Sequence, residues 1–153
     1  MTLKVGEKKM DSIVIVSGGF DPVHSGHVKL IEEASKFGNI VVLLNSDKWL
    51  ENKKGRAFLP FEERKIIMNA FRHVIDVIVC GEFDNTCIDG MKIILKKYPN
   101  YKIKFANGGD RNNNSTPETV FCESNGIETL WGIGGENKSN SSSWILKKWR
   151  END

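Results

Sequence analysis

The chain has 153 residues, of which 39% are hydrophobic, and its formal net charge is +2. This length suits one domain with one core, and the mixed, nearly balanced charge excludes the strongly basic face of a nucleic-acid-binding protein. No apolar run approaches the roughly 20 residues that span a bilayer, and three cysteines in unrelated contexts argue against a disulfide framework. We therefore expect a cytoplasmic protein whose partners include neither nucleic acid nor membrane.

Apolar segments alternate with helical patterns along the chain. Residues 1–11 are rich in Lys, Glu and Gly and predict a loose N-terminal tail. The elements predicted after it are, in order, strand 13–17, helix 28–36, strand 40–44, helix 61–73, strand 75–80, helix 87–98, strand 103–106, helix 117–125 and strand 127–131. This alternation predicts an α/β fold, namely a single Rossmann-like doubly wound domain over residues 12–150 with a five-stranded parallel sheet.

The stretch between the first strand and the first helix carries the clearest functional signal. It is rich in glycine and contains two histidines three residues apart, His24 and His27. A helix start attracts phosphate, because it offers unpaired backbone N–H groups and the positive end of the helix dipole. The histidines would add side-chain donors there, and Gly26 would let the backbone come close. Helix capping is the alternative interpretation of the pair, and a zinc site lacks a third ligand nearby.

Polar or glycine-rich loops also follow the second, fourth and fifth predicted strands. They comprise residues 45–47, 107–110 and 132–143. In a parallel sheet these loops meet at the carboxyl edge, where ligands bind. Ser141, Ser142 and Ser143 precede a further helical pattern, so one of them should cap it and the group should bind phosphate. A plain cap and linker is the alternative.

Two motifs resemble those of the nucleotidyltransferases marked by a His-x-Gly-His sequence, a cytidylyltransferase-like family. The first is His24-Ser25-Gly26-His27 after Gly18-Gly19-Phe20-Asp21, and the second is the serine-rich helix start at 140–143, in which Asn140 replaces a usual apolar residue. Segments 45–47, 53–56, 60–64, 74–76 and 107–110 resemble the heptose-1-phosphate adenylyltransferase branch, a near relative of glycerol-3-phosphate cytidylyltransferase. The resemblance covers residues 12–149.

The resemblance implies transfer of AMP or CMP from ATP or CTP to a phosphorylated sugar or polyol, with release of pyrophosphate. It favours ATP, because members of the heptose branch use it. A phosphate monoester is already largely dianionic at neutral pH, so the reaction needs no general base, only donors and cations around the transferring group. Mg²⁺ is the expected cofactor, held mainly by the nucleotide's phosphates and not by a protein metal site.

Site roles follow from the motifs. We assign catalysis to four residues, His24, His27, Lys54 and Arg64. We assign nucleotide binding to Gly19, Phe20, Gly26, Asn107, Gly108, Asp110, Ser141, Ser142 and Ser143, and acceptor binding to Asp21, Lys29 and Lys53. Asp21 is expected near the acceptor or Mg²⁺. Solvent-exposed side chains are the alternative interpretation of Arg64 and the lysines.

Two other functions are compatible with the same motifs. One is an adenylyltransferase for nicotinamide mononucleotide or phosphopantetheine, which shares the His-x-Gly-His type of motif. The other is a nucleotide-binding or sensing module without turnover. The acceptor is not specified by the sequence, and a homodimer agrees with the resemblance because family members are often dimers.

Overall fold

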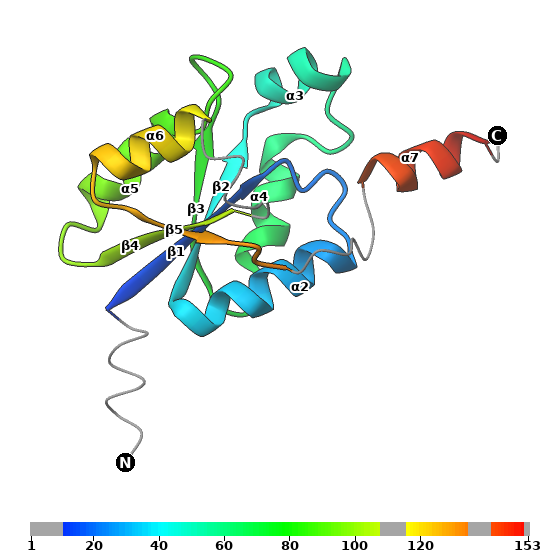
Figure 1. Ribbon diagram of the computed structural model, residues 1–153. Helices are drawn as coiled ribbons and strands as arrows, with labels where there is room; N and C mark the ends of the chain where they lie inside the picture. The colour runs from blue at the N-terminus through cyan, green and yellow to red at the C-terminus, as the bar shows by residue number, and fades with distance from the viewer. Residues whose placement is uncertain (1–10, 108–115, 135–141, 152–153) are drawn as a thin grey trace.

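A sheet of five parallel strands forms the centre of the protein (Figure 1). The computed structural model describes residues 11–107, 116–134 and 142–151. The strands are β1 (Ser12–Gly18), β2 (Asn39–Asn45), β3 (Val74–Cys80), β4 (Lys102–Asn107) and β5 (Glu128–Trp131). Their order across the sheet is β3-β2-β1-β4-β5. All five predicted strands are confirmed, each to within one residue at either end.

Helices connect the strands and also follow the last one. They are α2 (Ser25–Ala34), α3 (Asp47–Lys54), α4 (Phe61–Asn69), α5 (Ile88–Lys97), α6 (Pro117–Ser124) and α7 (Ser142–Glu151), with a 3₁₀ turn η1 (Ser35–Phe37) after α2. The sequence pattern predicts α4 as far as residue 73, but the helix ends at Asn69. The chain turns before β3 because His73 adopts a φ of +74°, in the left-handed region.

One helix, α3, was missing from the sequence prediction. Its N-cap is Ser46, whose hydroxyl accepts the backbone N–H of Trp49 at 3.0 Å, and α3 ends before Gly55, which has a φ of +93°. These are ordinary helix start and stop signals. Leu50 is the one buried residue of α3, so the helix lacks the apolar periodicity on which the other predictions depend.

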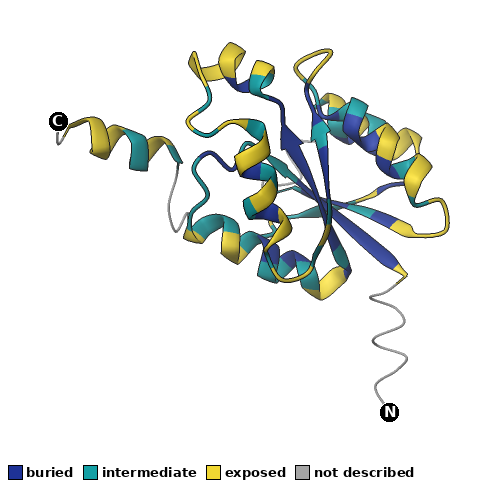
Figure 2. Ribbon diagram, turned by 180° about the vertical axis from the view of Figure 1, so that it is seen from behind, coloured by how far each residue is buried: buried dark blue, intermediate teal, exposed yellow. Residues whose placement is uncertain are grey.

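Apolar side chains cover both faces of the sheet, because alternate residues of a buried strand point to opposite sides. In β1, Ile13 and Ile15 face α5 and α6, whereas Val14 and Val16 face α2 and α4. β1 and β2 are mostly dark blue in Figure 2, and yellow is found mainly on the helices and loops around the sheet. Helices on both faces confirm the doubly wound fold. Three buried free thiols, Cys80, Cys87 and Cys122, lie in the α5 and α6 layer, as expected of small core residues.

The topology determines where a ligand can bind. The strand order reverses beside β1, which has β2 on one side and β4 on the other. In sheets of this type the crevice beyond the carboxyl ends of the strands at such a point is the binding site. The turn from β1 into α2 borders this crevice, and α7 extends away from the rest of the fold beyond it (Figure 1). Among the described helices, none is long and apolar enough to cross a membrane.

Candidate active site

The two histidines of the turn cap α2 reciprocally. His24 is the N-cap residue, and its Nδ1 accepts the backbone N–H of Gly26 at 3.1 Å. Nδ1 of His27 in turn accepts the backbone N–H of His24 at 3.1 Å. Two orphan donors at the helix start are thus satisfied by imidazoles instead of the usual Ser/Thr and Glu pair. Capping, which the sequence offered as an alternative to a functional role, is therefore present.

This capping sets the tautomer of both rings. A neutral imidazole has one donor and one acceptor nitrogen, so a ring that accepts at Nδ1 carries its proton on Nε2. His24 and His27 therefore both have an Nε2–H, directed away from the backbone groups that they cap. Capping and donation to a ligand use different nitrogens of the same ring. The two interpretations made from the sequence are therefore compatible.

Packing keeps His27 neutral. Its ring stacks on His24 with centroids 3.8 Å apart and lies 4.6 Å from the ring of the buried Phe20. Burial, with a smaller contribution from the neighbouring His24 charge, lowers the pKa of His27 to about 4. Phe20 has a φ of +49°, an unusual conformation for a non-glycine residue, and such strain concentrates at functional turns. At neutral pH His27 is therefore a hydrogen-bond donor without charge.

Asp21 ties the turn to the segment after α3. Its carboxylate is almost fully buried and accepts the backbone N–H groups of Phe58 at 2.6 Å and Leu59 at 2.7 Å. Lys54 completes the set, with Nζ 2.9 Å from Oδ2 and 2.9 Å from the Asp21 carbonyl oxygen. Both carboxylate oxygens are used within the protein. Asp21 thus ties the turn to the segment after α3, and its contact with the acceptor or Mg²⁺ stays a prediction.

The two adjacent lysines point to different places. Lys54 reaches the turn through Asp21, and its side chain is 29% exposed. Lys53 lies over the indole of Trp49, with Nζ 4.8 Å from the ring centroid. Only Lys54 of this pair is therefore brought to the His24 and His27 turn.

Arg64 is buried, contrary to the alternative interpretation of a solvent-exposed side chain. Its side chain is 0% exposed, and its guanidinium donates to four acceptors. They are the carbonyls of Leu59 (2.9 Å), Gly19 (3.1 Å) and Asn45 (2.7 Å) and the carboxylate of Asp47 (2.7 Å). The guanidinium is thus enclosed by groups of the protein itself. It joins the ends of β1 and β2 and holds the backbone from which the turn with His24 and His27 begins.

Asp47 lies in the segment 45–47 that the sequence pointed to, but its pairing with Arg64 was not predicted. It opens α3, and a carboxylate there is typical of any helix first turn. Its partner Arg64 is 17 residues away, so no local signal marks the pair.

The N-terminus of α7 meets the same turn. The Ser142 hydroxyl donates to the carbonyl of Pro22 at 2.8 Å, and the preceding chain is held to α2 by the Gly134 backbone N–H, 2.9 Å from Glu33 Oε2. The serine-rich helix start and the histidine turn are therefore adjacent in space. Ser143 lies in the first turn of α7 and is exposed.

The remaining predicted residues lie at the border of the site or outside the described residues. Gly19 packs tightly, since a Cβ there would lie 2.9 Å from Leu50 Cδ2. Asn107 ends β4 at the crevice, and Lys29 is exposed on α2. The predictions for Gly108, Asp110 and Ser141 fall outside the described residues.

Comparisons with known proteins show which family the chain belongs to. The sequence profile of the cytidylyltransferase-like family matches residues 15–116. The chain belongs to the cytidylyltransferase-like family. The bifunctional protein HldE of Salmonella paratyphi A is 34% identical over 132 residues, and that of Klebsiella pneumoniae is 32% identical over 132 residues. Each alignment covers 84% of this chain and 24% of the relative, so the chain spans about a quarter of the length of these relatives.

A solved structure shows the same fold. The lipopolysaccharide core biosynthesis protein from Thermoplasma volcanium GSS1 matches with a TM-score of 0.62 and 20% identity, covering 84% of this chain and 98% of that one. At this identity the likeness shows the fold alone.

The described part of this cytidylyltransferase-like domain contains no cluster of three or more His, Cys, Asp or Glu side chains that could hold a metal ion. Asp21, the nearest carboxylate to the turn, already binds two backbone N–H groups and Lys54.

Proposed function

We propose that this protein transfers the nucleotidyl group of ATP to the phosphate of a phosphorylated sugar and releases pyrophosphate. The observation that carries the proposal is the pair of Nε2–H donors of His24 and His27, fixed at the start of α2 by capping through Nδ1. The family supports the reaction class. The preference for a sugar phosphate and for ATP is supported by the resemblance of segments 45–47, 54–56 and 107–110 to the heptose-1-phosphate adenylyltransferase branch.

The reaction forms one bond and breaks one bond. An oxygen of the acceptor's phosphate dianion attacks the α-phosphorus in line, and the bond from the α-phosphorus to the pyrophosphate oxygen breaks. No proton has to be removed from the acceptor, since its second pKa is near ~6. Negative charge grows on the α-phosphoryl oxygens and on the leaving pyrophosphate, and fixed donors stabilise it without reorganisation.

Each described site residue has a separate task in this mechanism. His24 and His27 donate through Nε2 to the transferring phosphoryl group. The N-terminus of α7, anchored through Ser142, binds the β- and γ-phosphates. Lys54 supplies a positive charge at the turn, whereas Arg64 and Asp21 act as positioning residues that hold the turn in place.

Mg²⁺ fits this arrangement as a companion of the triphosphate. It prefers oxygen ligands and keeps several waters, so phosphate oxygens and water would hold it here. Bound there, it would neutralise charge on the phosphates.

A coupled pyrophosphate assay tests the proposal. ATP, CTP, GTP and UTP are each combined with Mg²⁺ and a panel of sugar 1-phosphates and polyol phosphates. We expect pyrophosphate release that requires both substrates, with ATP and a sugar 1-phosphate giving the highest kcat/KM. Pyrophosphate release only with the pair of CTP and a polyol phosphate would show that the protein is a cytidylyltransferase instead. Tight nucleotide binding without release from any pair would contradict transfer and support a nucleotide-binding module.

A further inference from the structure

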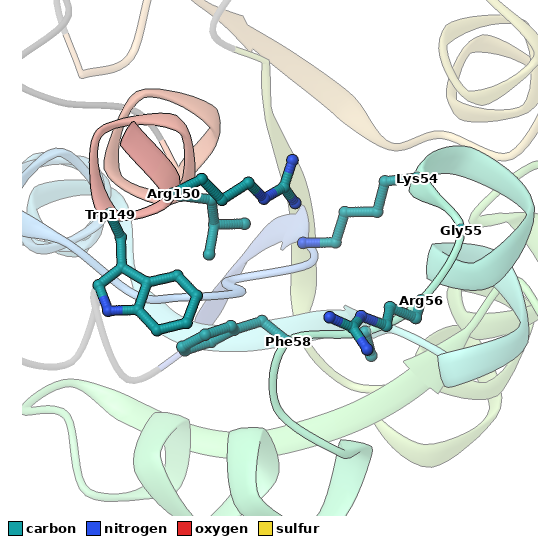
Figure 3. A pocket seen from close by; sticks show the side chains of 8 residues that line it. Lys54, Gly55, Arg56, Phe58, Trp149 and Arg150 are labelled. Atoms are coloured by element: carbon teal, nitrogen blue, oxygen red, sulfur yellow. The ribbon is translucent and has the colours of Figure 1, made fainter. Parts of the chain in front are cut away.

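A cavity of about 580 Å³ lies between the end of α3, with the segment that follows it, and the outer half of α7 (Figure 3). Lys54, Arg56 and Phe58 line one wall, and Trp149 and Arg150 line the other. The volume falls in the range of small-molecule sites, which combine aromatic walls with a few polar groups.

The cavity gathers positive charge. Figure 3 shows the Arg150 guanidinium and the Lys54 amino group pointing toward each other across it, with Arg56 on the same wall as Lys54. Lys54 pairs with Asp21, but no carboxylate among the described residues forms an ion pair with Arg56 or Arg150. Like charges facing one another across a cavity repel, and an anion between them removes that repulsion.

The cavity also adjoins the catalytic turn. Lys54 belongs to both, since its Nζ contacts the Asp21 carbonyl oxygen while its side chain lines the cavity. The α7 wall is joined to the same turn by the hydrogen bond from Ser142 to Pro22. A ligand in the cavity therefore has its anionic group beside the loop that carries His24 and His27.

We propose that this cavity is the acceptor site, in which a phosphorylated sugar binds with its phosphate between Lys54, Arg56 and Arg150 and its sugar ring against Trp149 and Phe58. The proposal rests on the proposed function. Arg150 and Trp149 are then the residues that select the acceptor. None of the described α7 residues is buried.

Kinetics of Arg150→Gln provide the first test. Lys148→Gln is the matched control, because it removes the same charge from the same helix at an exposed residue that does not line the cavity. We expect Arg150→Gln to raise the acceptor KM about tenfold or more, through loss of a charge-assisted contact, with the KM for ATP within about twofold of the parent. An acceptor KM equal to that of the Lys148→Gln variant would overturn the proposal.

Tryptophan fluorescence without nucleotide separates this proposal from the proposed function. Mannose 1-phosphate, glycerol 3-phosphate and inorganic phosphate are titrated into the protein and into Trp149→Phe and Trp144→Phe variants. We expect a saturable change with mannose 1-phosphate that survives Trp144→Phe and is lost in Trp149→Phe. Binding of this kind without pyrophosphate release would support the site and contradict the proposed function. An equal change in Trp149→Phe, or no change with any probe, would overturn the site even in an active enzyme.

Discussion

The histidine turn and the N-terminus of helix α7 are in contact, yet the fold holds the turn and the helix very differently. The turn contains the buried Phe20 and Asp21, a reciprocal capping pair, and direct support from the buried Arg64. α7 has no buried residue, and Ser142 provides its hydrogen bond to the turn. Groups that stabilise a transition state gain from being fixed in advance, whereas a wall that admits a substrate gains from being loosely held. In the proposed mechanism, the fixed turn would carry out the transfer and the loosely held α7 would admit the substrate.

The largest expected effect comes from removing the support of the turn. Arg64→Met leaves three backbone carbonyls without their donor, so we expect the free energy of unfolding to fall by about 3–5 kcal/mol. Urea unfolding measures it. Arg72→Met is the control, because the Arg72 side chain is 80% exposed and its ion pair with Glu32 should contribute no more than about 1 kcal/mol. Equal losses in the two variants would show that Arg64 does not hold the turn.

Two substitutions at His27 separate capping from donation. His27→Asn keeps an acceptor near the Nδ1 position and removes the distal donor, so we expect normal stability with kcat lowered about 10² to 10³-fold. His27→Gln places an amide near the Nε2 position but loses the cap, so it should retain more turnover and unfold more easily. Pyrophosphate release and urea unfolding provide the two readouts. The reverse pattern would assign His27 to capping alone.

The sequence predicted the strands and the motif turn well for a physical reason. A strand buried on both faces must be apolar throughout, so a continuous apolar segment such as 40–44 predicts a strand. The sequence analysis did not predict α3, because its single buried residue, Leu50, gives no apolar periodicity. Ser46 and Gly55 are nevertheless ordinary start and stop signals for this helix. The burial of Arg64 depends on carbonyls of Gly19 and Asn45 that are distant in the chain. Local patterns carry no information about such contacts, nor about the cavity beside α7.

The pKa of His27 predicts a pH dependence of stability. The folded protein binds a proton at His27 only near pH 4, whereas the unfolded chain binds it near pH 6.5. The unfolded state therefore gains protons first, and the free energy of unfolding decreases as the pH falls from about 7 toward 4. Allowing for the ring's partial exposure, we expect a loss of about 1 kcal/mol between pH 7.5 and 5 that is smaller in His27→Asn. Urea unfolding at both pH values checks this prediction. An equal loss of unfolding free energy in the parent and in His27→Asn would contradict the neutral state of the half-buried His27.

The smallest expected effect on stability concerns α7. Ser142→Ala removes the hydrogen bond to Pro22, which we expect to change the free energy of unfolding by no more than about 0.5 kcal/mol, because α7 adds little to the core. The KM for ATP should nevertheless rise roughly threefold to tenfold, since the phosphate-binding helix start loses its attachment. Ser124→Ala, at an exposed position at the end of α6, is the control. A large loss of stability would show that α7 is held as firmly as the turn.

The fate of each phosphorus atom of ATP tests most directly whether the fixed turn performs nucleotidyl transfer. The protein is incubated with Mg²⁺, a sugar 1-phosphate, and ATP labelled at either the α- or the γ-phosphorus, and the products are separated. We predict that the α-label enters a sugar nucleotide and the γ-label enters pyrophosphate in equal amounts, and that both products fall together in His27→Asn. Transfer of the γ-label to the sugar, or its release as orthophosphate while the α-label stays in ADP, would contradict nucleotidyl transfer.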